Sequence, residues 1–552
     1  MMSATKHLTP LQRFWGLLKP DKKEIRNVYV YAIFNGLINL SLPIGIQSII
    51  NLIQVGQVNT AWIVLVFFVI LGIAMSGVIQ VNQLRITENL QQKIFTRAAF
   101  EFAYRIPRIK MEQLYKHYAP ELMNRFFDVV SVQKGLSKII IDFSTASIQV
   151  LFGLILLSLY HPFFIIFSLI LVLLAYFIFK LTAKKGLETS LKESKHKYKI
   201  AHQLEEQART FITFKLAGKT DLPVQQINKT SDKYISARES HFRILVKQYS
   251  LLIGFKVLVA MGLLIIGSIL VMEQQMNIGQ FVASEIIIIL IMSSVEKLVL
   301  SLENIYDVLT SLEKIGQVTD LELEENTGRE ITESLTVNGM AVEMSNVSFS
   351  YPGSEIYILN NVSFKLGAGE SLLITGPNNS GKSTLLYLLA GIYKINNGYI
   401  AYDDIPIGNY NPESLRSYIG DCLMEEMLFE GTILENISMG RKRATFENVQ
   451  WAVEHLGLTD FIKSLPAGYD TIIHPQGQQF SQGIIDKLIL ARAIADKPRV
   501  LLIKDAFRLF EKDERIRILN FLTNKSHGWT LIIASSNKDL EFKADQVIEF
   551  NS

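Results

Sequence analysis

Residues 376–384 read Gly-Pro-Asn-Asn-Ser-Gly-Lys-Ser-Thr, which is a full match to the phosphate-binding pattern G-x-x-x-x-G-K-[ST]. An apolar run at 371–375 precedes the match and an amphipathic segment at 383–390 follows it, so the expected order is strand, loop and helix. In such a loop the glycines let successive backbone N–H groups turn toward an anion, and the helix dipole adds positive potential. The candidate phosphate-binding residues are Gly376, Pro377, Asn378, Asn379, Ser380, Gly381, Lys382, Ser383 and Thr384.

The flanking sequence predicts the domain that carries this loop. From residue 337 onward, short β-like runs alternate with helical segments, which is typical of an α/β nucleotide-binding domain and sets its bounds at 337–552. The preceding segment, 311–336, is acidic and polar and is interpreted as a linker. Within the loop, Lys382 is expected to reach the β- and γ-phosphates, and the Ser383 hydroxyl to bind Mg²⁺. The predicted strands include 341–348, 370–375, 399–402, 500–503 and 530–534.

The residues before this domain are unusually apolar. The 552-residue chain is 49% hydrophobic and 19% charged, whereas an average soluble protein carries roughly 25% charged residues. A helix needs roughly 20 mostly apolar residues to cross a bilayer core of about 30 Å. We therefore predict an all-α membrane domain at 28–310 with six membrane-spanning helices. The six stretches are Val28–Ile53, Thr60–Val81, Lys138–Tyr160, Pro162–Leu181, Leu251–Met272 and Ile278–Leu300.

Basic residues predict how the spans are oriented. The three short connections between spans carry no Lys or Arg, whereas the long connections at 82–137 and 182–250 are rich in both. The positive-inside rule therefore places the long connections, both termini and the nucleotide-binding domain in the cytoplasm of a multi-pass inner-membrane protein. Both long connections have apolar residues at i, i+3 and i+4 spacing, so we predict that they are helical.

The N-terminal segment, 1–27, has its own apolar pattern. Leu11, Phe14, Trp15 and Leu18 fall on one helical face, and basic residues lie beside them. This pattern predicts a short amphipathic helix that lies at the inner membrane surface in contact with lipid.

Four ionisable residues lie inside the apolar stretches, where charge is costly and side chains usually face the protein interior. Lys256 and Glu296 are expected at similar depth, so we predict that they form an ion pair. Glu285 lies nearer the outer surface without an evident partner and is a candidate for a substrate path. The fourth residue is Lys297.

Net charge and cysteine content exclude other classes of function. The formal net charge of +3 is too small to indicate a nucleic-acid partner. The single cysteine, Cys422, excludes an intramolecular disulfide framework and a metal site built from several cysteines.

Further motifs accompany the phosphate-binding loop. With the six spans, they resemble an ATP-binding cassette (ABC) exporter half-transporter over essentially the whole chain, and residues 279–300 read closest to the toxin- and peptide-exporting branch. Tyr351 matches the residue that stacks on adenine, and Glu121–Arg125 with Asp128 resembles the first cytoplasmic coupling helix. The other matching stretches are Asn346–Pro352, Phe429–Ile437, Tyr469–Thr471 and Leu490–Ala493.

The resemblance implies a fold, ligands and a partner. The fold is a type IV exporter-like membrane domain of six helices followed by an α/β P-loop domain. ATP and Mg²⁺ are the implied ligands, and the implied partner is a second half-transporter. Each ATP is sandwiched between one P-loop and the signature of the other subunit. Here the signature stretch reads Phe-Ser-Gln-Gly-Ile at 480–484 in place of Leu-Ser-Gly-Gly-Gln. Ser481 and Gly483 are retained, and Gln482 adds a side chain where backbone is expected to approach the γ-phosphate.

The chain departs from the family at the positions that serve hydrolysis. Met424 stands where the family has the Q-loop glutamine, and Ser535 where it has the switch histidine. Lys504-Asp505 replaces the Asp-Glu that ends the catalytic strand, so an ammonium replaces a carboxylate and the general-base position is one methylene shorter. Arg508 and Phe510 also alter the D-loop that follows. These changes predict a member of the ABC ATPase family that binds ATP but hydrolyses it poorly or not at all.

Three functions remain open at this stage. The favoured one is an impaired subunit of a heterodimeric exporter. The alternatives are a homodimeric exporter that uses Asp505 as its base, and a membrane regulator or scaffold that binds ATP without transport. The Mg²⁺ dependence also stays open, because Lys504 either supplies part of the metal's charge or extends into solvent. The sequence does not identify the substrate or a periplasmic adaptor partner.

Overall fold

The computed structural model describes residues 8–54, 60–115, 117–331, 339–423, 427–505, 507, 510–536 and 543–550. It divides into two compact units. The first comprises residues up to 107 together with 117–321, and the second comprises 108–116 together with 322–552.

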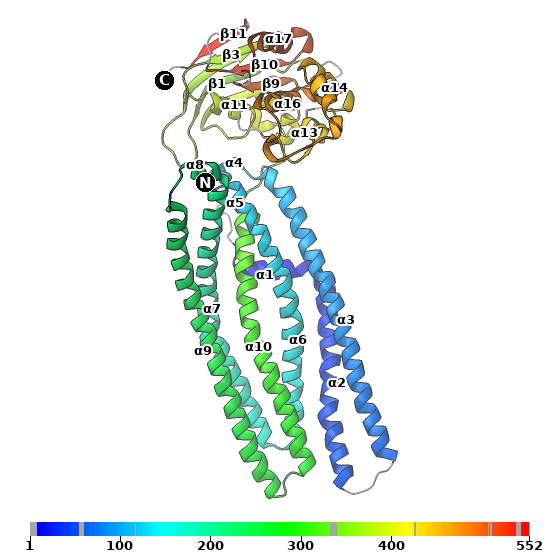
Figure 1. Cartoon of the computed structure of the whole chain (residues 1–552). Helices are drawn as coiled ribbons and strands as arrows, with labels where there is room; N and C mark the ends of the chain where they lie inside the picture. The colour runs from blue at the N-terminus through cyan, green and yellow to red at the C-terminus, as the bar shows by residue number, and fades with distance from the viewer. Residues whose placement is uncertain are drawn as a thin grey trace. The chain divides into compact units, whose positions relative to one another are not determined.

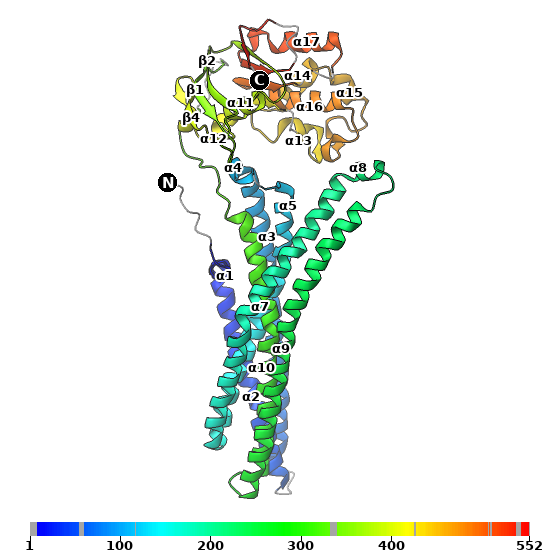
Figure 2. The same cartoon turned by 90° about the vertical axis from the view of Figure 1, so that its left-hand side faces the viewer.

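The first unit is entirely helical over the residues described. Six of its helical stretches are long and apolar enough to cross a membrane, which confirms the predicted number of spans. In Figures 1 and 2, α2 lies beside α3 and α7 beside α9. Its helices are α1 (Pro10–Leu18), α2 (Lys22–Gln54), α3 (Thr60–Arg105), α5 (Ala119–Met123), α6 (Asp128–Tyr160), α7 (Phe163–Arg209), α8 (Phe211–Leu216), α9 (Leu222–Met272) and α10 (Ile278–Thr319).

These helices are much longer than a bilayer requires. At 1.5 Å per residue, about 20 residues cross the hydrocarbon core, whereas α9 has 51 residues and α7 has 47. The long basic connections are therefore helical, as predicted, because they continue the spanning helices. The last helix, α10, also continues to Thr319 and so runs past the predicted start of the linker at residue 311.

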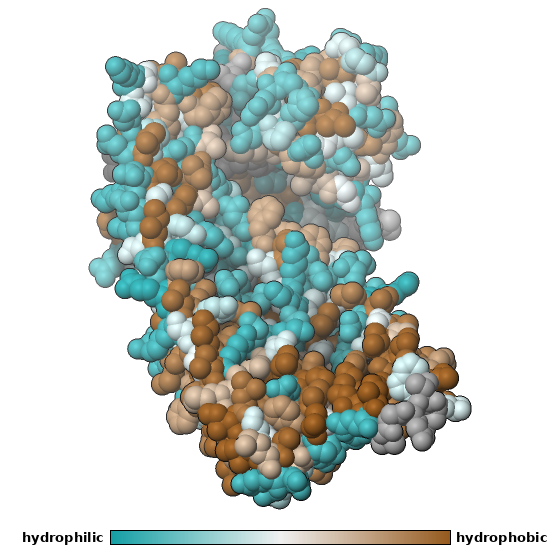
Figure 3. Space-filling model, turned by 60° about the horizontal axis from the view of Figure 1, so that its bottom comes forward, coloured by the Kyte–Doolittle hydropathy of each residue, from teal (hydrophilic) through white to brown (hydrophobic). Residues whose placement is uncertain are grey.

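Apolar residues both hold the helices together and cover their outer surface. One buried cluster joins α6, α7, α9 and α10 and includes Phe164, Leu252 and Ile287. Other large apolar side chains point outward, for example Phe67, which is 61% exposed. Brown, apolar residues gather over the helices of this unit in Figure 3. Such a surface is what a helical bundle presents to lipid.

Two charged contacts test the predictions for this unit. Lys256 Nζ on α9 lies 2.7 Å from Glu296 Oε2 on α10, so the predicted ion pair is confirmed. Glu285 has no ionic partner among the residues that the structure describes. The guanidinium of Arg13 on α1 donates to both carboxylate oxygens of Asp320, which follows α10.

The apolar residues of α1 do not share one environment. Leu11 and Trp15 are exposed, which suits contact with lipid, whereas Phe14 and Leu18 pack against the buried residues of α2, α3 and α6. The single apolar face predicted for this segment is therefore divided between lipid and the helical bundle. Thr9 and Gln12 form a capping box that starts the helix.

The second unit contains a parallel five-stranded sheet in the order β11-β3-β10-β9-β6 and an antiparallel sheet in the order β2-β1-β4-β5. The predicted runs of strand are confirmed. The strands are β1 (Val342–Phe349), β2 (Leu359–Leu366), β3 (Ser371–Thr375), β4 (Asn397–Tyr402), β5 (Ile405–Pro406), β6 (Ile419–Cys422), β7 (Gly431–Thr432), β8 (Ile472–Ile473), β9 (Val500–Lys504), β10 (Thr530–Ala534) and β11 (Gln546–Glu549). The helices are α4 (Met111–Leu114), α11 (Lys382–Leu389), α12 (Pro412–Arg416), α13 (Ile433–Ser438), α14 (Phe446–His455), α15 (Thr459–Ser464), α16 (Gln482–Ala495) and α17 (Lys512–Leu522).

The buried residues of this unit form two cores. One lies between the antiparallel sheet, α11 and the parallel sheet, and the other joins the parallel sheet to α13, α14, α16 and α17. Both faces of the parallel sheet are thus covered. This explains why its central strands read as continuous apolar runs rather than alternating ones.

Residues 108–116 belong to this second unit although the sequence places them inside the membrane domain. Ile109 pairs with Leu323 in an isolated β-bridge, and the Glu112 carboxylate accepts the backbone N–H of Lys394 at 3.1 Å. The segment 121–125, which resembles the coupling helix in sequence, lies in the first unit instead. Arg125 is buried there over the ring of Tyr198 at 3.8 Å. The assignment of Glu121–Arg125 as the coupling helix stays a prediction from the sequence resemblance.

Candidate nucleotide-binding site

The phosphate-binding loop joins the buried strand β3 to the first turn of α11, as the sequence predicts. Both ends of the loop require glycine, since Gly376 has φ 148° and Gly381 has φ 94°. A Cβ atom added at Gly376 would lie 2.5 Å from the carbonyl oxygen of Phe550, and one at Gly381 would lie 2.8 Å from Leu359 Cδ2. The close packing of the loop against Phe550, which follows β11, and Leu359 of β2 therefore leaves no room for a side chain at either glycine.

Lys382 points back into the loop. Its side chain is buried, and Nζ donates to the carbonyl oxygens of Gly376 and Pro377, both at 2.7 Å. Burial lowers the pKa of Lys382, while Asp505 raises it and Lys504 lowers it further. The neighbouring Ser383 is partly exposed in the first turn of α11.

Tyr351 lies beside the loop, as expected of the adenine-stacking residue. Its hydroxyl is 3.0 Å from the hydroxyl of Thr384, and its ring meets Phe349 and Tyr393 at steep angles. A third aromatic residue was not anticipated. The Tyr115 ring is stacked on Tyr351 with a centroid distance of 5.1 Å and an interplanar angle of 10°. Tyr115 therefore covers one face of the ring on which the base is expected to stack.

The carboxyl ends of the parallel strands bring the altered hydrolytic positions together. Lys504 ends β9 opposite Ala534, which ends β10. Asp505 follows in the left-handed region with φ 46°, and its N–H donates to the Ala534 carbonyl at 3.0 Å. Its Oδ1 accepts hydrogen bonds from Ser535 Oγ at 3.2 Å and from the backbone N–H of Ser536 at 3.0 Å. The candidate base is thus held by two residues of the next strand end.

Lys504 occupies the position at which the family has a carboxylate. It is half-buried, and among the residues that the structure describes it has no hydrogen bond or ion pair. Its charge is near enough to Lys382 to act on that group. Two ammonium groups and one carboxylate therefore lie at the carboxyl edge of β3 and β9.

These residues do not fit Mg²⁺. The ion prefers six oxygen ligands in octahedral geometry, usually with one or two carboxylates. Ser383 offers a hydroxyl, but Lys504 offers a positive charge where an anionic ligand is expected. Met424, at the Q-loop position, and Arg508 lie outside the described residues.

The signature residues lie at the start of α16, separate from the P-loop. Ser481 is the N-cap residue and Gly483 has open space around it, so the backbone there is accessible to a ligand. The Gln482 side chain turns along the helix and donates to Asp486 Oδ1 at 2.8 Å. Phe510, expected to alter the D-loop, is buried in the helical core of the unit.

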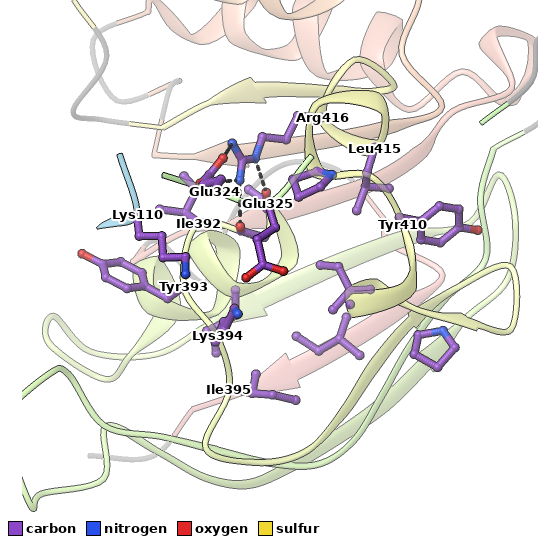
Figure 4. Close-up of a pocket in the computed structure, with 18 of the residues that line it drawn as sticks. Lys110, Glu324, Glu325, Ile392, Tyr393, Lys394, Ile395, Tyr410, Leu415 and Arg416 are labelled. Atoms are coloured by element: carbon purple, nitrogen blue, oxygen red, sulfur yellow. Dashed lines mark hydrogen bonds and ion pairs between the residues drawn. The ribbon is translucent and has the colours of Figure 1, made fainter. Parts of the chain in front are cut away.

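A separate cavity of about 460 Å³ lies elsewhere in the second unit (Figure 4). Its walls are mostly apolar, and Arg416 binds both carboxylate oxygens of Glu324 at 2.8 Å beside it. Lys110 and Lys394 supply further charge at the cavity. No residue of 376–384 lines this cavity, so it is distinct from the phosphate-binding loop.

Comparison with known proteins places both units in one family. Residues 359–508 match the ABC transporter cassette, and residues 26–295 match the ABC transporter transmembrane region. The solved structure of a bacterial Atm1-family ABC exporter with ATP bound has a TM-score of 0.85 and 19% identity. That similarity covers 96% of this chain and 94% of the exporter, and it shows the fold.

Curated relatives are similar over part of their length. YknU of Bacillus subtilis, an uncharacterised ABC transporter ATP-binding protein, is 30% identical over 64% of this chain and 60% of its own. YfiB of the same organism, described in the same words, is 32% identical over 43% of this chain and 40% of its own. The alpha-hemolysin translocation ATP-binding protein HlyB of Escherichia coli O157:H7 is 29% identical over 51% of this chain and 40% of its own.

Proposed function

Because the chain belongs to the ABC transporter family, we propose that it is an exporter half-transporter that binds ATP at 376–384 and hydrolyses it poorly or not at all. A second half-transporter with intact hydrolytic groups acts beside it. Together they couple ATP to export of a substrate across the inner membrane, with the nucleotide-binding domain in the cytoplasm.

Nucleotide binding is supported by the backbone of the P-loop. The two glycines that the loop needs are held in left-handed conformations, and Lys382 and Tyr351 are in reach of it. Backbone N–H groups and a helix N-terminus provide most of the affinity of such a site for phosphate. These parts depend on the fold of β3 and α11, which is complete.

The observation that carries the proposal is the pair Lys504 and Asp505. Phosphoryl transfer to water needs a positioned nucleophile and neutralisation of the charge on the transferring group. Asp505 already accepts hydrogen bonds from Ser535 and Ser536, so its carboxylate is directed toward β10 and the segment after it. Ser535 also lacks the imidazole that the family places there. Loss of a general base alone costs about 10²- to 10⁴-fold in rate.

The need for a partner follows from this impairment. In ABC dimers each nucleotide lies between a P-loop and the signature of the other subunit. Ser481 and Gly483 leave an accessible helix start that suits this role. A competent partner would supply the catalytic strand and histidine for the second nucleotide. The relatives named for translocation, such as HlyB, support export as the direction of transport.

The test is to purify the full chain in nanodiscs and to measure ATP binding and phosphate release in the same samples. Lys382→Ala removes the phosphate contact, and Lys463→Ala, an exposed lysine on α15, is the matched control. We expect wild type and Lys463→Ala to bind ATP and to release phosphate no faster than Lys382→Ala. Faster release by wild type would favour a homodimer that uses Asp505. Absence of binding in wild type would contradict all three functions, since each of them includes ATP binding.

A further inference from the structure

The phosphate-binding edge carries an unusual balance of charge. Lys382 begins α11 after the loop that follows β3, and Lys504 ends β9; β10 lies between these two strands, and the charge of Lys504 acts on Lys382. Asp505 is the carboxylate beside them, and its Oδ1 is already occupied by Ser535 and Ser536. These three described side chains, two ammonium groups and one carboxylate, together carry a net positive charge.

Lys504 has no partner of its own in the part of the chain that the structure describes. A half-buried ammonium that lacks a counter-charge is unfavourable, because the protein surrounds it with a lower dielectric than water. An anion bound at the P-loop would supply that counter-charge. The triphosphate of a nucleotide is such an anion, and β9 holds Lys504 at the same sheet edge at which the P-loop begins.

The same charges oppose a divalent cation. Mg²⁺ would have to bind beside two ammonium groups, with the Ser383 hydroxyl as a protein ligand and without the carboxylate that normally holds its water shell. In most P-loop sites the cation neutralises the β- and γ-phosphates. Here an ammonium, that of Lys504, lies at the end of β9 and acts on Lys382 of the phosphate-binding loop.

We infer that this site binds the nucleoside triphosphate without Mg²⁺, with the Lys504 ammonium taking over part of the charge neutralisation that the metal provides in related sites. The inference rests on the proposed function, since it concerns the same nucleotide. It adds that the metal is dispensable for binding. It also accounts for weak hydrolysis, because a lysine cannot replace the metal in organising water around the γ-phosphate.

The experiment compares nucleotide affinity with and without the metal. The full chain in nanodiscs is titrated with a fluorescent ATP analogue, once in EDTA and once in excess MgCl₂. We expect wild type to bind at least as tightly in EDTA as in Mg²⁺, because the free anion is the form that binds. An affinity that falls about tenfold or more when Mg²⁺ is removed would overturn the inference.

Three variants separate the role of the charge from that of the side chain. Lys504→Met keeps the apolar stem and should lose about tenfold in affinity in EDTA, whereas Lys504→Arg should keep the wild-type behaviour. Lys504→Asp restores the family's carboxylate and should bind about tenfold more tightly with Mg²⁺ than in EDTA. Equal affinity of wild type and Lys504→Met in EDTA would show that the lysine extends into solvent and would contradict the inference.

Further measurements distinguish metal-independent binding from the ATP-binding function on which it rests. Mn²⁺ paramagnetic resonance on the nucleotide-loaded protein should show no bound metal for wild type and one bound metal for Lys504→Asp. Tight binding that requires Mg²⁺ overturns the inference and leaves the ATP-binding function intact. Lack of binding under both conditions overturns both. If Lys504→Asp fails a thermal-unfolding check, the wild-type comparison and Lys504→Arg still decide the question.

Discussion

The P-loop and the ends of β9 and β10 lie on the same edge of one sheet. The P-loop matches the family pattern, whereas the strand ends depart from it. The P-loop retains each residue of its pattern, including the two glycines whose Cβ atoms would collide with Phe550 and Leu359. The strand ends keep their pairing, with Lys504 opposite Ala534, but have exchanged the side chains that serve hydrolysis. Binding and hydrolysis therefore depend on different parts of the same edge.

This difference has a physical cause. Backbone conformation at the P-loop is fixed by packing, so substitution there disturbs the fold as well as the ligand. Lys504 and Asp505 at the end of β9 are only partly buried, so their replacement leaves the buried strand residues unchanged. The sheet can thus lose catalytic groups while it keeps a nucleotide site. Variants at the P-loop and at the strand ends test whether nucleotide binding and hydrolysis can be changed independently.

The largest effect is expected from removing the P-loop lysine. Lys382→Ala deletes the ammonium that the carbonyls of Gly376 and Pro377 hold inside the loop. Since charge-assisted contacts to phosphate are strong, affinity for ATP should fall by about a hundredfold. Equilibrium binding of a fluorescent ATP analogue measures it, with Lys463→Ala as the control. Unchanged affinity would show that the nucleotide binds elsewhere.

The next largest effect is expected when the residues at the strand ends are changed back to those of the family. Lys504→Asp, Asp505→Glu and Ser535→His together restore three of the family's hydrolytic groups. Because such groups act as a unit, each single reversal should do little, whereas the triple variant should raise phosphate release about tenfold or more. Phosphate release by the triple variant is measured against that of the same variant carrying Lys382→Ala, which gives the background rate. A triple variant as inactive as wild type would place the defect outside this edge.

A smaller change is expected from the aromatic stack on the base site. Tyr115 covers one face of Tyr351, so the adenine must compete with it for that face. Aromatic pairs of this kind contribute about 0.5–1.5 kcal/mol beyond area burial. Tyr115→Ala should therefore tighten ATP binding by a few-fold, while Tyr115→Phe should not. Weaker binding by Tyr115→Ala would mean that both rings enclose the base.

The smallest effect is expected at Asp505, the candidate base. Asp505→Asn keeps an oxygen that can accept from Ser535 and Ser536, so ATP affinity and phosphate release should both stay within about twofold of wild type. If Asp505 acted as the general base, this substitution would instead lower the rate of phosphate release by about 10²- to 10⁴-fold. Steady-state phosphate release decides between the two.

Local patterns were enough to predict much of this architecture. Six apolar stretches, the P-loop with its strand and helix, and the Lys256–Glu296 pair all follow from spacing and hydropathy over neighbouring residues. The hydrogen bond between Asp505 and Ser535 was found only in the structure, where adjacent parallel strands end at one edge.

Contacts between distant segments were not predictable in the same way. The stacking of Tyr115 on Tyr351 and the packing of 108–116 with the second unit depend on tertiary structure that one sequence does not encode in any local spacing. The divided face of α1 has the same origin, because Phe14 is partly buried by residues of α2, α3, α6 and α10. Similarly, the double contact of Arg13 with Asp320 links the two ends of the first unit.

The most direct test of the central claim is the chemical fate of nucleotide retained by the protein. Purified full-length chain is incubated with ATP labelled on the adenine, freed of unbound nucleotide, and analysed for ATP and ADP over time. Our account predicts that wild type retains ATP as intact triphosphate, both in EDTA and in Mg²⁺, and that Lys382→Ala retains none. Conversion of the retained nucleotide to ADP by wild type alone would contradict it.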